Sequence, residues 1–293
     1  MLDLSHIPNS QQDIKVFYAN GSAWQTWHKP RKCNYVWIMC IGGAGGGGGG
    51  NNLSNYVWVS GGGSGATSRA LYNAQYLPDR LYVQVGLGGA GGAPGVAAQG
   101  SPGSPGTRSI VTLQPTLLAQ NLVAISGAAA ATGGSYSPGS VGETASTQAT
   151  ASFYSLSNFV STAGVGSSNP GNGTGFGNIT PFTSQITCPG AGGDTLTAGV
   201  KDGASILATS ITPIILGGLG STTGNAGNGA NGITSYKPFY SLGGAGGGST
   251  SAGIGGNGGN GGIGSGGGGA GSGSSGGGTG GKGGDGLVII ISF

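Results

Sequence analysis

Apolar residues along the chain gather in short runs that glycine-rich stretches separate. Two of these runs, residues 35–41 (YVWIMCI) and 287–293 (LVIIISF), are almost unbroken. Strands that are covered on both faces have this pattern, and β-branched residues favour the middle of a sheet. We therefore expect residues 287–291 to pair centrally with a strand formed by residues 35–41 or 81–85.

Shorter apolar runs predict the remaining strands. Asn20-Gly21 lies between the first two of them, and Asn-Gly favours the type I′ turn of a β-hairpin. No run shows a sustained 3.6-residue apolar period, and each glycine disfavours a helix by about 1 kcal/mol. The sequence thus predicts an all-β sandwich with glycine tracts in the loops at one end. The shorter predicted strands are residues 14–19, 22–27, 56–60, 66–71, 81–85, 110–113, 122–125, 182–187, 211–216 and a segment near Phe153.

Glycine accounts for 72 of the 293 residues, and only 6% of the residues are charged. Ordinary domains carry roughly 7% glycine and about 25% charged residues, so this composition is typical of disordered or fibrous chains. Here, however, the polar residues are mainly uncharged, and the apolar residues lie in strand-like runs. Because side chains are scarce, hydrogen bonds between backbones are expected to hold the glycine segments.

The last glycine tract, residues 243–286, has a three-residue repeat. Glycine pairs separate Ile254, Asn257, Asn260 and Ile263. Polyproline II has three residues per turn, so the repeat predicts packed polyproline II or polyglycine II helices with glycine at their contacts. We expect the two asparagines to face outward or to reach local carbonyls. The alternative is a flexible Gly/Ser linker.

Charge and reactive residues argue against several function classes. The net charge is +3 without a basic stripe, which disfavours nucleic-acid binding. The two histidines and the seven acidic residues are scattered singly, so we expect no enzyme activity, no metal and no cofactor. Residues 1–13 lack the pattern of a signal peptide, and the longest apolar run is too short to span a bilayer, so no membrane insertion is expected. The three cysteines are expected to be free buried thiols.

Two glycine motifs resemble nucleotide-binding signatures. Residues 86–91 fit G-x-G-x-x-G, but prolines follow where a dinucleotide site needs a helix. Residues 276–282 resemble a P-loop, but Gly283 stands where a magnesium-binding Ser or Thr belongs, and a strand is predicted next. We expect neither motif to bind a nucleotide.

Exposed aromatic residues are the remaining candidates for recognition. Tyr56 and Trp58 flank a glycine loop, where they either pack in the core or stack on sugar rings. The candidate surface-recognition residues are Tyr56, Trp58, Phe153, Tyr154, Tyr236, Phe239 and Tyr240.

The order of several segments resembles the glycine-rich domain of phage tail and virion structural proteins. The matching segments are Trp24…Trp27-His28-Lys29-Pro30, YVWI, GGAGGGGGG, GGGSGATSRALY, LYVQVGLGGAGG, GTRSIV, LVAISGAAAATGG and GGKGGDGLVIIISF. The resemblance covers residues 20–134 and 241–293, and residues 135–240 depart from it. It implies a jelly-roll or TNF-like sandwich without a shared catalytic residue. We expect residues 1–13 to be an arm and residues 14–293 to be one domain, with residues 135–240 as an insertion.

These features favour a non-enzymatic structural component of a virus or phage particle, such as a capsid, fibre or tail protein. Its expected partners are other virion proteins and copies of itself, with a trimer favoured. Its expected location is the virion, after synthesis in the host cytoplasm. The alternative is a host-recognition adhesin whose glycine-rich loops bind a surface glycan or receptor. An enzyme such as a depolymerase is disfavoured by the scarcity of acids and histidines.

Overall fold

The protein is described from a computed structural model. Its described residues are 13–52, 59–96, 99–126, 134, 160–162, 186–194 and 199–293. These residues form strands and extended segments, with helical structure only in two short 3₁₀ turns, Ala74–Tyr76 and Ala119–Asn121. The prediction of an all-β protein is therefore confirmed.

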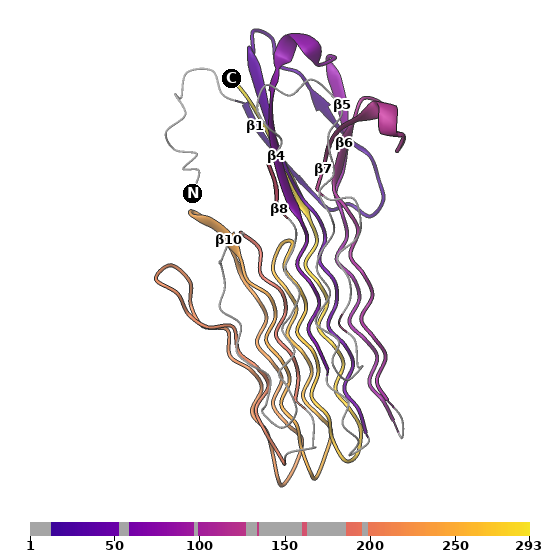
Figure 1. Ribbon diagram of the computed structural model, residues 1–293, viewed down its shortest axis with the longest axis vertical. Helices are drawn as coiled ribbons and strands as arrows, with labels where there is room; N and C mark the ends of the chain where they lie inside the picture. The colour runs from indigo at the N-terminus through magenta and orange to yellow at the C-terminus, as the bar shows by residue number, and fades with distance from the viewer. Residues whose placement is uncertain are drawn as a thin grey trace.

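Strands form two main sheets at one end of the molecule (Figure 1). The chain's last strand lies inside the first sheet, between the first and third strands, and pairs antiparallel with both. The predicted central pairing of residues 287–291 with residues 35–41 is thus confirmed. The first sheet contains, in spatial order, β1 (Asp13–Tyr18), β11 (Leu287–Ser292), β3 (Tyr35–Ile41), β4 (Thr67–Asn73) and β8 (Val160–Thr162). The second contains β2 (Gln25–His28), β5 (Arg80–Gln84), β6 (Ile110–Thr112) and β7 (Leu122–Ile125).

The two sheets share one hydrophobic core. Ile38 and Ile290 face it from the first sheet, and Trp27, Leu81 and Val111 face it from the second, all of them buried. The opposite face of the first sheet carries a separate apolar cluster that includes Met39, Ile41, Leu287, Ile289 and Ile291. Apolar side chains therefore cover both faces of β11 and β3, as the unbroken apolar runs predict.

The predicted hairpin around Asn20-Gly21 is wrong. β1 pairs with β11 in one sheet, whereas β2 pairs with β5 in the other. A type I′ turn needs positive φ at both central residues. Gly21 has φ of +58°, but Lys32 is the non-glycine residue with positive φ in the described part of the chain, so Asn20 does not adopt the turn conformation. The burial of Trp27 in the shared core outweighs the local turn preference, and the chain crosses from one sheet to the other here.

Below the sheets, the glycine-rich segments run side by side along the long axis of the molecule (Figure 1). Residues 264–273 lie at the centre of this glycine bundle, and every main-chain N–H from 264 to 273 donates to a main-chain carbonyl. Partners in each neighbouring segment recur every third residue, which is the period of polyproline II. The packed-helix prediction is therefore confirmed for the tract. The described segments that bond to residues 264–273 are 45–51, 62–65, 188–194, 244–250, 256–262 and 278–285.

Glycine is required in the bundle because neighbouring backbones leave no room for a side chain. A Cβ added at Gly268 would lie 2.0 Å from the Ala245 oxygen, and one added at Gly259 would lie 2.0 Å from the Ala230 oxygen. Real Cβ atoms do not approach other atoms so closely. The spacing of glycines in the sequence is thus the spacing that close packing of the backbones requires.

Asparagine side chains join the outer segments of the bundle. Asn228 and Asn231 Oδ1 accept hydrogen bonds from main-chain N–H groups 29 residues later, each at 2.8 Å. Asn257 and Asn260 Oδ1 accept in turn from the N–H groups of Thr279 and Lys282, 22 residues later. Asn257 and Asn260 are exposed, as expected, but their side-chain oxygens accept from an N–H of the next segment rather than reaching local carbonyls. We call these two rows of side chain-to-backbone bonds the asparagine ladder.

The region predicted as an insertion, residues 135–240, contributes to the bundle where it is described. Residues 190–194 and 226–232 bond to neighbouring glycine segments. The strand predicted at 211–216 is absent: Ile215 makes an isolated bridge with Ile206, and Pro213 removes a donor. The strand near Phe153 and most of residues 182–187 lie outside the described part. Within the described part, β9 (Thr234–Tyr236) and β10 (Phe239–Ser241) form a further two-stranded sheet.

The three cysteines are free thiols, as predicted. Cys40 and Cys188 are buried and Cys33 is half-buried. Burial raises the pKa of Cys40 and of Cys188 to about 12, so both thiols stay protonated and weakly reactive at neutral pH.

Among the described residues, none belongs to a helix with the length and apolar character needed to cross a membrane.

Candidate functional site

The predicted recognition residues fall into two groups. Tyr56, Trp58, Phe153 and Tyr154 lie outside the described residues, and Tyr236, Phe239 and Tyr240 lie on the β9–β10 pair. The structure thus brings three of the seven together, on a hairpin rather than at a loop tip of the glycine bundle.

Of these three aromatic residues, Tyr236 is the most exposed. The residue is 53% exposed, and its ring packs edge-on against that of Phe239, with ring centroids 5.9 Å apart. Phe239 packs in turn on the outer cluster of the first sheet, and Tyr240 packs on a second cluster within the bundle. Tyr236 is therefore the one of the three with a large free surface.

Tyr236 also contacts Tyr18, the last residue of β1. Partial burial, and then the interaction with the nearby Tyr18, raises the pKa of Tyr236 to about 12. Its phenol is therefore protonated at neutral pH. Tyr18 is 52% exposed, so two aromatic rings from distant parts of the chain form one accessible surface.

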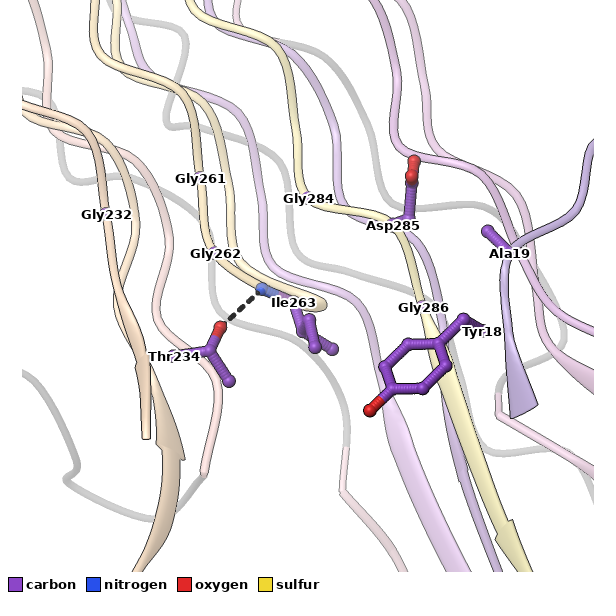
Figure 2. A pocket seen from close by; sticks show the side chains of 10 residues that line it. All are labelled: Tyr18, Ala19, Gly232, Thr234, Gly261, Gly262, Ile263, Gly284, Asp285 and Gly286. Carbon is purple, nitrogen blue, oxygen red and sulfur yellow. Dashed lines mark hydrogen bonds between the residues drawn. The ribbon is translucent and has the colours of Figure 1, made fainter. Parts of the chain in front are cut away.

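Tyr18 borders an open pocket of about 440 Å³ where the glycine bundle meets the first sheet (Figure 2). We call it the junction pocket. Glycine backbone forms much of its wall, and Ile263 lies between Thr234 and Tyr18 in the view of Figure 2. The volume is within the range of small-molecule sites, about 300–1,000 Å³. The residues that line it are Tyr18, Ala19, Gly232, Thr234, Gly261, Gly262, Ile263, Gly284, Asp285 and Gly286.

Asp285 supplies the charged group of the junction pocket. Its Oδ1 atom accepts a hydrogen bond from the Gly88 N–H at 2.8 Å and pairs with Lys282 Nζ at 3.0 Å. These contacts hold the carboxylate pointing away from Tyr18 and Ile263 (Figure 2), and the Oδ2 atom makes no hydrogen bond with a described residue.

The asparagine ladder stops at this pocket. Asn257 and Asn260 accept from the N–H groups of Thr279 and Lys282, and the next residue in the row, three positions on, is Ile263. An isoleucine has no acceptor, so the Asp285 N–H has no hydrogen-bond partner among the described residues. The Asp285 N–H is therefore a donor without an acceptor at this end of the row, whereas the Asp285 carboxylate points away from Tyr18 and Ile263 (Figure 2).

Comparison with known protein families gives a match over most of the chain. The family model for a glycine-rich domain matches residues 19–292, which is nearly the whole chain. The chain belongs to the glycine-rich domain family. A comparison with curated protein sequences finds no match. The family match runs through residues 135–240 as well, the region that the sequence resemblance leaves out.

Sequence reasoning missed the two most informative pocket residues of this glycine-rich domain. Tyr18 lay in a predicted hairpin, and Asp285 was one of several scattered acids. The available signal was the row itself, because Ile254 and Ile263 interrupt an otherwise asparagine-bearing three-residue repeat. The interruption at position 263 marks the pocket.

A second pocket of about 470 Å³ lies beside the two 3₁₀ turns of the glycine-rich domain. Tyr76 is exposed there, and the Asn121 amide donates to Gln114 Oε1 at 3.4 Å and to Thr116 Oγ1 at 3.2 Å. The amides of Asn121 and Gln114 thus bond to each other in this pocket.

The two nucleotide-like motifs of the glycine-rich domain are segments of the bundle. The N–H groups of Gly89 and Gly283, which a phosphate would need, donate to main-chain carbonyls of neighbouring segments. Within the described residues, no group of three His, Cys, Asp or Glu side chains is arranged to hold a metal ion.

Proposed function

We propose that this glycine-rich domain is a non-enzymatic structural component of a virus or phage particle, which acts through contacts with other virion proteins. The observation that supports the proposal most directly is the glycine bundle. Its central segment, residues 264–273, bonds to six surrounding segments mainly through backbone groups. Such a body is stiff for its mass, since few side chains can rearrange within it.

The elongated shape supports the same role. The sandwich lies at one end, and the glycine segments extend from it along the long axis (Figure 1). A stiff extension on a compact sandwich suits a protein that holds a surface at a fixed distance from its attachment point. The resemblance to phage tail and virion proteins in the order of glycine and strand segments favours this placement.

The proposal is tested by locating the protein in particles. Antibodies against the purified domain are applied to gradient-purified particles from the lysate in which the protein is made, and gold-labelled secondary antibodies are imaged by electron microscopy. We expect label at one recurring position on the particle, with none from pre-immune serum. Recovery of all the protein in the soluble fraction, with unlabelled particles, would contradict the proposal.

The alternative function, recognition of a host surface, is favoured by a different observation. Tyr18 and Tyr236 form an exposed aromatic surface next to an open pocket. An adhesin of this kind would use the side of the molecule at the junction of sandwich and bundle.

A further inference from the structure

We propose that Asn20 is a site of self-catalysed deamidation, and that the asparagine ladder protects its own Asn-Gly pairs from the same reaction. This inference is independent of the structural role and assigns a modification site to the domain. It rests on a contrast among asparagines that are all exposed and all followed by glycine. The Asn-Gly pairs in the described part of the chain are Asn20-Gly21, Asn228-Gly229, Asn231-Gly232, Asn257-Gly258 and Asn260-Gly261.

Deamidation at an Asn-Gly pair is an intramolecular substitution. The main-chain nitrogen of the glycine loses its proton and bonds to the asparagine Cγ, the Cγ–Nδ2 bond breaks, and the amide nitrogen takes up a proton and leaves as ammonia. Water then opens the resulting succinimide ring at either carbonyl, which gives aspartate or isoaspartate. Glycine favours the reaction because it has no Cβ and its backbone rotates freely. The reaction therefore needs a free glycine N–H and a side chain that can fold back onto its own backbone.

Asn20-Gly21 meets both requirements. The pair lies between β1 and β2, where the chain crosses from one sheet to the other, and both residues are exposed. The Asn20 carbonyl accepts from the Ala23 N–H at 3.1 Å, but neither the Asn20 side-chain amide nor the Gly21 N–H makes a hydrogen bond with a described residue. A Cβ built at Gly21 meets no heavy atom within 4 Å, so the described residues leave open space around the glycine.

In the asparagine ladder, the glycine N–H groups are occupied. Each glycine that follows a ladder asparagine donates its N–H to a main-chain carbonyl of the next segment. A nitrogen whose proton is held in this way is harder to deprotonate, because loss of the proton also breaks the hydrogen bond. The four bonds, at 2.7–3.0 Å, run from Gly229 to Asn257, Gly232 to Asn260, Gly258 to Thr279 and Gly261 to Lys282.

The ladder also holds the asparagine side chains away from their own backbone. Asn257 Oδ1 accepts from the Thr279 N–H at 2.8 Å, and the other three Oδ1 atoms accept equivalent bonds at 2.8–2.9 Å. A side chain that reaches the next segment cannot at the same time place its Cγ against the nitrogen of the following residue. Rotation of the backbone is restricted as well, since a Cβ added at Gly258 would lie 2.0 Å from the Gly268 oxygen.

Peptide mapping by mass spectrometry tests the proposal on the full folded chain, incubated in mildly alkaline buffer without any enzyme. We expect aspartate and isoaspartate to accumulate at Asn20 at least about ten times faster than at any ladder asparagine, because the ladder residues react only when the bundle opens locally. One such reaction lowers the formal net charge from +3 to +2, so ion exchange separates the products. An Asn20 that stays intact, or a ladder asparagine that reacts as fast as Asn20, would overturn the proposal.

The chain unfolded in urea is the control for effects of local sequence. Each of the five asparagines is followed by glycine, so all five should deamidate at similar rates once the ladder is lost. A preference for Asn20 that is as large in urea as in the folded protein would show that local sequence sets the rates, and would contradict protection by the ladder.

Thr279→Pro tests one ladder bond by itself. Proline has no N–H and fits the φ of polyproline II, so the substitution removes the donor to Asn257 Oδ1 but keeps the carbonyl that accepts from Gly258. We expect Asn257 to deamidate at least about threefold faster, and Asn260, whose donor is Lys282, to be unchanged. Thr279→Ala keeps the N–H and should leave both rates unchanged. An unaltered rate at Asn257 in Thr279→Pro protein with the circular dichroism spectrum of the parent would refute the role of the ladder bond.

Discussion

Gly268→Ala is expected to destabilise the protein by about 3 kcal/mol or more, because one methyl group cannot enter the centre of the glycine bundle. The added Cβ would lie 2.0 Å from the Ala245 oxygen and 2.7 Å from its carbonyl carbon. Neither backbone can move aside, since residues 264–273 bond to neighbours on all sides. In thermal unfolding followed by circular dichroism, this corresponds to a fall in Tm of roughly 6–12 °C.

Gly224→Ala is the matched control for Gly268→Ala. A Cβ built at Gly224 meets no heavy atom within 4 Å, and its φ is not in the left-handed region. The same chemical change should therefore alter stability by less than about 0.5 kcal/mol. Equal and negligible effects of the two substitutions would favour a loosely held tract over a packed bundle.

Ile290→Ala is expected to cost about 2–5 kcal/mol of folding free energy, the usual range for such truncations in a core. Ile290 is fully buried in the central strand β11, where it faces the core shared by both sheets. Its removal leaves a cavity between sheets that strand pairing prevents from collapsing. Urea unfolding monitored by tryptophan fluorescence measures the loss, because Trp27 lies in the same cluster.

Ile14→Ala is the control for Ile290→Ala. Ile14 lies on β1, pairs with Ile291 and is 46% exposed. Its truncation should cost less than about 1 kcal/mol, because little buried surface is lost. A cost for Ile290→Ala as small as that for Ile14→Ala would contradict the assignment of β11 to the centre of the core.

The sequence predicts the strands and the bundle better than it predicts how they are connected. Continuous apolar runs identify β3 and β11 because burial on both faces removes polar residues from a strand. Asn20-Gly21 predicts a hairpin that does not form, because a local turn preference cannot show that Trp27 packs in the shared core. The three-residue repeat predicts helices with glycine contacts, and the structure shows those contacts at Gly259 and Gly268.

The candidate site was less predictable than the fold. Each row of the asparagine ladder acts on a segment 22 or 29 residues away, and loop lengths alone do not fix which N–H meets which side chain. That Ile263 lies opposite Asp285 and offers its N–H no acceptor is therefore visible only in the structure, which fixes how the segments are aligned. Tyr18 reaches the pocket because β1 pairs with β11, a contact across the whole length of the chain.

Amide hydrogen exchange measured residue by residue by NMR tests the central claim most directly. The account predicts that the N–H groups of residues 264–273 exchange as slowly as those of β11, because each one is hydrogen-bonded inside the bundle. The Asp285 N–H, which has no acceptor among the described residues, should exchange much faster than its neighbours in the row, Thr279 and Lys282. Exchange of residues 264–273 at the rate of an unfolded chain, while β11 stays protected, would contradict the bundle and the structural role proposed from it.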